Sequence, residues 1–434
     1  MIIYKKTILL LSIIFISFFF LSGCVKDLPH YTVAHVGGLT VSSFEFEEKY
    51  KHHLLKTDIK DSPEERINIL EKLISKKLLA NAWISTNIPI DSIAQTQINE
   101  KRNTALRDAL YKHEILIKPF SPSDSLLKTH FLWKNTDVFV RHIFSLNILE
   151  IDSIYKLISK SIDQFDKIAQ STFKNKTLVE TGGELGWVSY NQMDPTFEIA
   201  MYNLPIDSIS NPVRSAYGWH IIQVLDKRVQ GIISESDYEK NKLDLKNGIL
   251  YKKRQIAANN YVNNLMESAN VNINDTLTNN VLGMIAELLK ENDNQLQESQ
   301  PEKFIKPLLA TLKILVNENL AVFDLGAFTV GDFISRLHLL PTNIVRQDLL
   351  KGFYYLLRDK VLEEKARNYG LENDLTVLIK TKDAEDDVRA SLYLSSIKND
   401  YHIKSGELKQ LTDSLRSIYN VSIYKNNFDL IFQK

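Results

Sequence analysis

The sequence predicts an α+β protein in which a short run of β-strands lies inside a mainly helical chain. Between Val138 and Val229, apolar and other residues alternate along two segments that are separated by turn residues such as Gly182-Gly183, a pattern typical of strands. On both sides, apolar residues recur at helical spacing behind helix-capping serines. At 434 residues the chain exceeds the size of one hydrophobic core, so we expect two or three domains.

The N-terminal residues are typical of an exported lipoprotein. Two lysines precede an apolar run that ends in Leu21-Ser22-Gly23-Cys24. A basic segment, a short apolar run and small residues indicate a signal peptide, and the run is too short to span a membrane as a helix. The last four residues match the bacterial lipobox, which implies cleavage before Cys24 and lipidation of its thiol, with palmitate among the modifying acyl groups. An uncleaved membrane anchor is the alternative, and the single cysteine excludes an internal disulfide.

The charge balance argues against a nucleic-acid partner. Lys+Arg and Asp+Glu number 53 each, and removal of the two lysines with the signal peptide leaves a mature chain near −2. Basic residues cluster only briefly, as in Lys252-Lys253-Arg254, and a nucleic-acid site would need a larger basic patch. Residues 24–34 form a short tether, which would keep the body of the protein close to its membrane.

Turn and cap signals organise the segment that follows the tether. Gly37-Gly38 separates two short apolar stretches, which predicts a β-hairpin. Ser42 stands three residues before a glutamate, and Ser62 precedes Pro63 and a second glutamate at the same spacing. Both are signatures of helix N-termini. A longer helix is expected from about residue 91 to 118, so residues 35–136 form a helical module.

Two histidines stand out in the predicted strands of the central block. His142 follows Val138 and Val140 at strand spacing, and His220 precedes Ile222 and Val224 in the same way; the same face of the first strand would carry Phe144 and Leu146. An imidazole on an apolar face needs a hydrogen-bond partner. The two histidines can therefore satisfy each other across neighbouring strands, although each could also be a solitary core histidine.

The order and spacing of these residues resemble the parvulin family of peptidyl-prolyl isomerases. The resemblance rests on the strand around His142, followed by Gly182-Gly183-Glu184-Leu185-Gly186, Asn211-Pro212-Val213 and Gly218-Trp219-His220-Ile221-Ile222. It implies a four-stranded antiparallel sheet with helices over residues 137–230 and rotamase activity. It also implies a catalytic set of His142, His220, Ser215 and Lys176 and a prolyl-binding set of Met193, Phe197 and Tyr217, which would otherwise be ordinary core residues.

One position departs from the family pattern. Lys176 stands where parvulins usually carry Cys or Asp, and a charged lysine cannot accept a hydrogen bond. We therefore expect weak or absent activity and expect that Lys176→Asp would raise it. The loop after the first strand contains acidic residues and no arginine, which argues against a preference for phosphorylated Ser-Pro sites. No cofactor is implied, and no metal-site motif is present.

The flanking helical regions resemble the chaperone body of SurA- and PrsA-type foldases, so the parvulin-like domain would be inserted in a mainly α-helical SurA-like body. The C-terminal third repeats the first: residues 325–333 align with residues 36–44 at an offset of 289, although chance similarity is an alternative. The expected division is a signal peptide (1–23), a tether (24–34), an N-terminal helical chaperone module (35–136), a parvulin-like domain (137–230), a long helix with a following helix (231–290), a linker (291–314) and a second, degenerate helical module (315–434).

These inferences together predict a lipid-anchored isomerase and chaperone of the bacterial cell envelope, placed most naturally at the outer membrane facing the periplasm. Its partners would be unfolded or nascent envelope proteins that contain proline, among them outer-membrane β-barrels. Two alternatives stay open: a chaperone of the same fold with an inactive pocket, and a scaffold lipoprotein that uses the parvulin-like domain as a docking surface.

Overall fold

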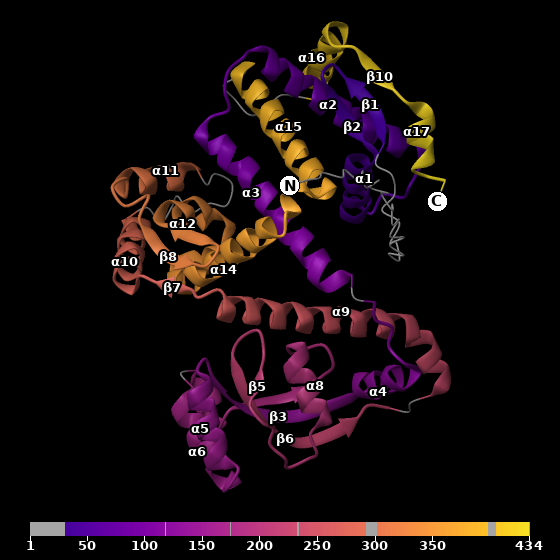
Figure 1. Cartoon of the computed structure of the whole chain (residues 1–434). Coiled ribbons are helices and arrows are strands. Elements are labelled where there is room, and N and C mark those ends of the chain that lie inside the picture. Colours follow the sequence, from indigo (N-terminus) through magenta and orange to yellow (C-terminus); the bar gives the residue numbers. More distant parts are fainter. Residues whose placement is uncertain are drawn as a thin grey trace, which may run out of the picture. The chain divides into compact units, whose positions relative to one another are not determined.

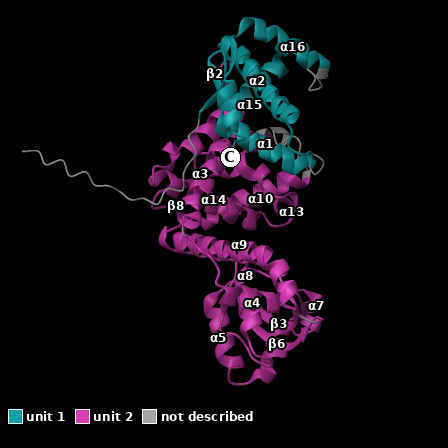
Figure 2. Ribbon diagram, turned by 90° about the vertical axis from the view of Figure 1, so that its right-hand side faces the viewer, with its two compact units in different colours: residues 1–88, 386–434 teal, residues 89–385 magenta. Residues whose placement is uncertain are grey.

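The computed structural model describes residues 31–117, 119–173, 175–231, 234–291, 302–397 and 405–433, and the expected lipobox and most of the tether lie outside these ranges. The chain divides into two compact units (Figure 2): unit 1 holds residues 1–88 and 386–434, and unit 2 holds residues 89–385. Within the described ranges, no helix combines the length and the apolar character needed to span a bilayer. The predicted α+β fold is confirmed, because one four-stranded and two three-stranded sheets lie among many helices.

Unit 1 is built from segments at opposite ends of the sequence. Its elements are β1 (Thr32–Val36), β2 (Leu39–Ser42), α1 (Ser43–Thr57), α2 (Pro63–Ser85), the end of α15 (Leu375–Ile397), α16 (Ser405–Ile418), β10 (Val421–Ile423) and α17 (Lys425–Leu430). The sheet has the order β10-β1-β2, and Ala34 of β1 pairs with Ile423 of β10. The core of unit 1 joins Phe46 and Leu70 to Leu415 and Phe428. Neither end of the sequence therefore forms this unit alone.

The predicted helix starts of the N-terminal segment are confirmed. Ser42 accepts a hydrogen bond from the backbone N–H of Glu45, and Ser62 does the same from Glu65. The carboxylate of Glu45 also lies 3.0 Å from Nζ of Lys77. Lys77 is 1% exposed and its ammonium is 2.8 Å from Asp386, which is fully buried. A buried ion-pair cluster thus connects α1, α2 and α15.

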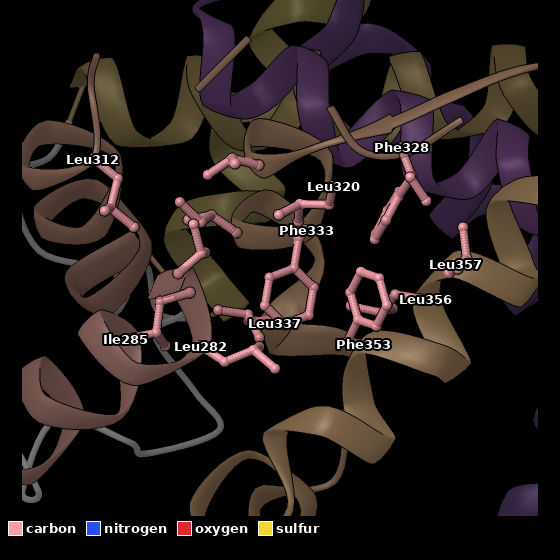
Figure 3. Close-up of a cluster of buried hydrophobic side chains, with 14 of the residues drawn as sticks. Leu282, Ile285, Leu312, Leu320, Phe328, Phe333, Leu337, Phe353, Leu356 and Leu357 are labelled. Carbon is pink, nitrogen blue, oxygen red and sulfur yellow. The ribbon is translucent and has the colours of Figure 1, made fainter. Parts of the chain in front are cut away.

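The helical part of unit 2 surrounds a second hairpin. Its elements are α3 (Ser92–Tyr111), a π-helical turn (Lys112–Leu116), α9 (Glu235–Ser268), β7 (Asn272–Ile273), α10 (Asp275–Glu291), α11 (Glu302–Thr311), β8 (Asn319–Phe323), β9 (Gly326–Thr329), α12 (Val330–Arg336), α13 (Thr342–Gln347), α14 (Leu349–Asn368) and the start of α15, with 3₁₀ turns at 337–339 and 371–373. The sheet order is β7-β8-β9. Figure 3 shows its core, in which Phe333 of α12 lies beside Phe353 of α14, and Leu320 of β8 and Ile285 of α10 belong to the same cluster.

The remaining part of unit 2 is the block of strands that carries the two histidines. Its elements are α4 (Asp124–Lys134), β3 (Thr136–Ser145), α5 (Ile148–Ile158), a 3₁₀ turn (Ile162–Gln164), α6 (Phe165–Thr172), α7 (Lys176–Glu180), β4 (Glu184–Val188), α8 (Pro195–Asn203), β5 (Val213–Arg214) and β6 (Trp219–Val229). The sheet is four-stranded and antiparallel, as predicted, and its strand order is β4-β3-β6-β5. Ile143 and Ile221 face α5 and α6, whereas Val140 and Ile222 face α8.

Several details differ from the prediction. Leu146 does not share the inner face, because β3 ends at Ser145 and the Leu146 side chain is 79% exposed. The expected linker 291–314 contains α11, and Leu308 and Leu312 at 2% and 1% exposure belong to the core of unit 2; residues 292–301 are outside the described ranges. The expected module 35–136 is divided at residue 88, because α3 packs against α14 in unit 2.

Candidate active site

The two strand histidines lie side by side on the α8 face of the sheet. β3 and β6 pair so that His142 is opposite Ile222 and Phe144 is opposite His220. This register leaves His142 and His220 on a diagonal, with their Nδ1 atoms 3.1 Å apart and their rings stacked at 5.4 Å between centroids. One imidazole must donate its Nδ1–H while the other accepts. The predicted pairing of the two histidines is therefore confirmed by geometry.

Ser215 extends this hydrogen-bonded pair. Its Oγ lies 2.7 Å from Nε2 of His220 and accepts a hydrogen bond of 3.0 Å from the backbone N–H of Tyr217. Ser215 and His220 are buried, at 5% and 7% exposure. The order Ser215–His220–His142 thus forms a continuous chain of hydrogen bonds from the turn before β6 to the middle of β3. Each link restricts the tautomer and rotation of the next side chain.

Burial keeps both imidazoles neutral. The pKa of His142 falls from 6.5 to about 4 because burial disfavours its charged form, and a charge on the neighbouring His220 would lower it further. Burial also lowers the pKa of His220 to about 4, against a smaller opposing effect of the Asp194 carboxylate. Near pH 7 the pair therefore supplies hydrogen bonds without supplying a charge.

A cavity of about 480 Å³ opens above the histidine pair. Its floor is His142, His220 and Phe197, whose ring meets that of His220 edge-on at 5.2 Å. Phe197 is 3% exposed, whereas Tyr217 at 69% exposed stands at the rim. The full lining is His142, Leu185, Gln192, Met193, Asp194, Pro195, Phe197, Ser215, Ala216, Tyr217, His220, Gln255 and Asn259. All three predicted prolyl-binding residues therefore line one cavity together with His142, His220 and Ser215.

The glycine pair before β4 fixes the position of His142 within the strand. Gly183 has φ +85°, and a Cβ there would lie 2.3 Å from the carbonyl oxygen of His142, so only glycine fits. The Gly183 carbonyl accepts a 3.0 Å hydrogen bond from the His142 backbone N–H. The side chain of Phe173 packs against the His142 ring at 5.1 Å between centroids.

Lys176 does not join the catalytic set, and this prediction was wrong. Its side chain is 88% exposed, lies 3.7 Å from Glu180 and is not among the residues that line the cavity. The cause is local: Asn175 caps α7 through the Leu178 N–H, and the lysine is the first residue of that helix. Phe173, not Lys176, faces His142. The expectation of weak activity caused by a lysine beside the histidines therefore loses its structural basis.

Several cavity residues were not identified from the sequence. Asp194 caps α8 by accepting from the Thr196 N–H at 2.8 Å and also accepts a 3.3 Å hydrogen bond from the Ala216 N–H, which ties α8 to the turn before β6. The Asp194-Pro195 pair is a helix-start signal that the sequence offered. Gln255 and Asn259 come from α9, outside the strand block, and nothing in the local sequence distinguishes them from other polar residues of that helix.

Comparison with known proteins finds a family match within the strand block and several similar proteins. Residues 148–228 match the family model of the PPIC-type PPIase domain. A protein named chaperone SurA from Nitrosococcus oceani is 39% identical over 84 residues, covering 19% of this chain and 20% of that protein. A foldase protein PrsA from Oceanobacillus iheyensis is 34% identical over 142 residues, 32% of this chain and 47% of that protein. A parvulin-like PPIase from Rickettsia felis is 25% identical over 232 residues, 50% of this chain and 82% of that protein.

These matches identify the strand block as a PPIC-type parvulin domain, as predicted. Of the relatives named above, this chain spans about a fifth of the SurA protein and about half of the PrsA protein. The matched length is 84 residues for the SurA protein, 142 for the PrsA protein and 232 for the parvulin-like PPIase.

Proposed function

We propose that this chain is a peptidyl-prolyl cis-trans isomerase joined to a helical chaperone body at the bacterial cell envelope. The observation that carries the proposal is the Ser215–His220–His142 chain beneath an apolar cavity that Met193, Phe197 and Tyr217 line. The match to the PPIC-type PPIase domain and the names of the relatives, which include chaperone and foldase, support it.

The geometry suits the rotation of an X–Pro bond. The barrier of about 20 kcal/mol comes from amide resonance, and no covalent intermediate is needed to lower it. A prolyl ring held against Phe197 and Met193 would leave its amide out of water, where the charge-separated planar form is less stabilised than in solvent. The neutral histidine pair would support the floor of the site while adding no charge that attracts water. His142, His220 and Ser215 thus act in this proposal as the polar base of an apolar clamp.

The decisive experiment is a protease-free measurement of cis-trans exchange in a short Ala-Pro peptide by NMR, where the unaided reaction takes tens of seconds. The full chain should shorten this time, and Met193→Ala should reduce the effect about tenfold or more through loss of contact with the prolyl ring. Thr196→Ala, a neighbouring side chain that is not among the cavity-lining residues, is the matched control. Peptide binding without acceleration would instead support an inactive binding module.

The chaperone activity is assigned in this proposal to the helical units. Two of the relatives are named chaperone and foldase, and helices form most of the chain outside the parvulin domain. The clients would be unfolded, proline-containing envelope proteins, among them outer-membrane β-barrels. Deletion of residues 138–229 should leave much of the suppression of client aggregation, measured by light scattering. If the isolated domain gave all of the suppression, this assignment would be wrong.

The location rests on the lipobox at residues 21–24. We propose that the mature chain begins at Cys24, carries acyl chains there and is held at the outer membrane facing the periplasm. Cys24→Ala should abolish labelling with radioactive palmitate and leave the precursor uncleaved. Unchanged labelling would contradict the lipid anchor without affecting the proposed isomerase activity.

A further inference from the structure

We infer that helix α9 is part of the substrate site: Gln255 and Asn259 bind the main chain of the client beside the proline. The inference rests on the proposed function and names residues outside the segment that matches the PPIase domain. It also specifies the ligand as an extended peptide longer than the X–Pro pair itself.

The two amides face the cavity from one side of the helix. Gln255 and Asn259 are four residues apart in α9, so their side chains share one face. Both line the cavity that holds His142, Phe197 and Tyr217, and both are half-buried. In Figures 1 and 2, α9 runs beside α8 of the parvulin domain, and the two helices are in contact. The prolyl cavity therefore has one wall that the parvulin segment does not encode.

Buried contacts hold this wall in place. Lys252, one turn before Gln255, is 6% exposed and donates a hydrogen bond to the fully buried carboxylate of Glu198 in α8. The Lys252 ammonium also lies 3.4 Å from the centroid of the Tyr190 ring. Glu198 in turn accepts a 2.6 Å hydrogen bond from the Asn191 N–H in the loop before α8. Because α8 carries Phe197, the same contacts that fix α9 also fix the floor of the cavity.

A second ion pair holds the far end of α9. Arg214 of β5 lies 2.6 Å from Glu267, twelve residues beyond Gln255. The two attachments lie on either side of the cavity-lining positions along the helix. This part of α9 is therefore anchored at two points to the domain that contains the histidine pair.

The chemistry of the wall fits a peptide backbone. A carboxamide both donates and accepts hydrogen bonds, as a peptide group does, so it can bind an extended main chain whatever the side chains are. The Gln255 amide already donates to the Tyr251 hydroxyl at 2.7 Å, which orients it. The charged side chain among the lining residues is Asp194, since both histidines are neutral near pH 7. A site of this kind favours neutral or basic segments around the proline and does not favour phosphorylated ones.

The test compares peptide lengths in the full chain. We expect the double variant Gln255→Ala/Asn259→Ala to raise the KM of a ten-residue Ala-Pro peptide about tenfold, with kcat nearly unchanged. The KM of a blocked Ala-Pro dipeptide should rise much less, because that peptide offers fewer main-chain groups beside the proline to the two amides. Asn260→Ala is the matched control, because Asn260 is the adjacent, exposed amide of the same helix. Circular dichroism melting should be the same for all variants.

The outcomes separate this inference from the proposed function. Equal KM values for wild type and double variant on the long peptide, with turnover intact, would overturn the role of α9 and leave the isomerase standing. Equal losses for long and short peptides would also overturn it, since they would indicate a general distortion of the cavity. If wild type binds the long peptide without turnover, a tenfold rise in the anisotropy Kd of a labelled peptide replaces the KM criterion. Neither turnover nor binding in wild type would overturn both.

Discussion

The parvulin domain and unit 1 are assembled in opposite ways. All four strands of the parvulin sheet lie between residues 136 and 229, and its two core clusters draw on residues between 133 and 224. Unit 1 instead joins residues before 88 to residues after 386, with Val36 paired to Val421 across the whole sequence. The first is one continuous segment, and the second depends on both ends of the chain.

The helical part of unit 2 contains a three-stranded sheet with the same pairing pattern as that of unit 1. Its hairpin β8-β9 matches β1-β2: Phe323 pairs with Gly326 as Val36 pairs with Leu39, and a third strand adds to the first strand in each case. The third strands are β7 and β10, and they lie in two similar sequences, Asn270-Val271-Asn272-Ile273 and Asn420-Val421-Ser422-Ile423. Strand β7, which pairs with the hairpin of unit 2, follows the first helical half of the chain. Strand β10, which pairs with the hairpin of unit 1, follows the second helical half.

The same ion pair occurs beside both hairpins. Glu45 lies at the third position of the helix after β2 and binds Lys77; Asp332 lies at the third position after β9 and is 3.8 Å from Lys360. Val36 and Phe323 are 287 residues apart, and so are Glu45 and Asp332, so the hairpins align at an offset of 287 rather than the predicted 289. They support the repeat of 35–136 within 315–434, which stays a prediction.

The largest expected effect tests the dependence of unit 1 on the C-terminal segment. A chain that ends at Ile397 lacks α16, β10 and α17 and exposes the core around Phe46. Unit 1 should lose its cooperative unfolding, a loss on the order of 5 kcal/mol or more, while isomerisation of a dipeptide substrate continues. Two-step thermal unfolding followed by calorimetry measures the first effect. Retention of both transitions in the truncated chain would show that unit 1 does not depend on its C-terminal segment.

The second prediction distinguishes the two related ion pairs. Lys77→Met leaves the buried carboxylates of Glu45 and Asp386 without their shared lysine and should cost about 3–5 kcal/mol of unfolding free energy. Lys360→Met should cost about 1 kcal/mol or less, because Lys360 is 17% exposed and its partners are reached by water. Urea unfolding of both variants gives the ratio. Equal losses would mean that the two copies bury their ion pairs alike.

The third prediction concerns the continuous domain. His142→Leu should destabilise the parvulin domain by about 1–3 kcal/mol, because Nδ1 of His220 loses its partner in a buried site. His35→Leu serves as the control in unit 1, since His35 is an exposed residue of β1. Hydrogen exchange resolved by region should show faster opening of β3 and β6 only in the first variant. Faster exchange in unit 1 as well would show that the two regions are energetically coupled.

The fourth prediction is a pH dependence of the stability of the parvulin domain. The folded-state pKa values of His142 and His220, about 4, are below the ordinary value of 6.5, so the unfolded state binds more protons between these limits. Stability should therefore fall as the pH falls from 6.5 to 4, by about 1 kcal/mol per imidazole at pH 5.5. The His142→Leu variant should show a smaller slope. A domain whose stability rises on mild acidification would contradict the buried neutral pair.

The smallest expected effect is that of Lys176→Asp. The side chain is 88% exposed at the first position of α7, so stability should change by less than about 0.5 kcal/mol and isomerase activity should be unaltered. A clear gain in activity would restore the original expectation that Lys176 faces the histidines. The measurement is the same NMR exchange assay used for the wild-type chain.

Local signals in the sequence predicted local structure well. Ser42 and Ser62 cap the helices that they were expected to cap, and strand alternation placed His142 and His220 on one face. These features depend on residues within a few positions of one another. The sequence prediction placed Lys176 wrongly because Asn175 caps α7 and Lys176 begins that helix with an exposed side chain. Matching one position to a family pattern does not reveal such a cap.

Partners distant in sequence could not be predicted in this way. A helical spacing shows that α3 has an apolar face, but it does not say whether that face meets α2 or α14. The same limit applies to Gln255 and Asn259, because the contact of α9 with α8 depends on the Glu198–Lys252 pair, which joins residues 54 positions apart. For α3 and for α9 alike, the local sequence does not specify which helix packs against it.

The pairing of β1 with β10 has a consequence for the time course of biosynthesis. The ribosome makes β1 well before β10, and at about 5–20 residues per second the interval is tens of seconds. During this interval the parvulin domain can fold, while the hairpin at residues 32–42 has an open edge and the Phe46 side chain has no completed core. The N-terminal segment of unit 1 therefore stays incompletely folded until β10 pairs with β1. Mutations that delay this pairing should cause aggregation of the newly made chain rather than loss of native stability.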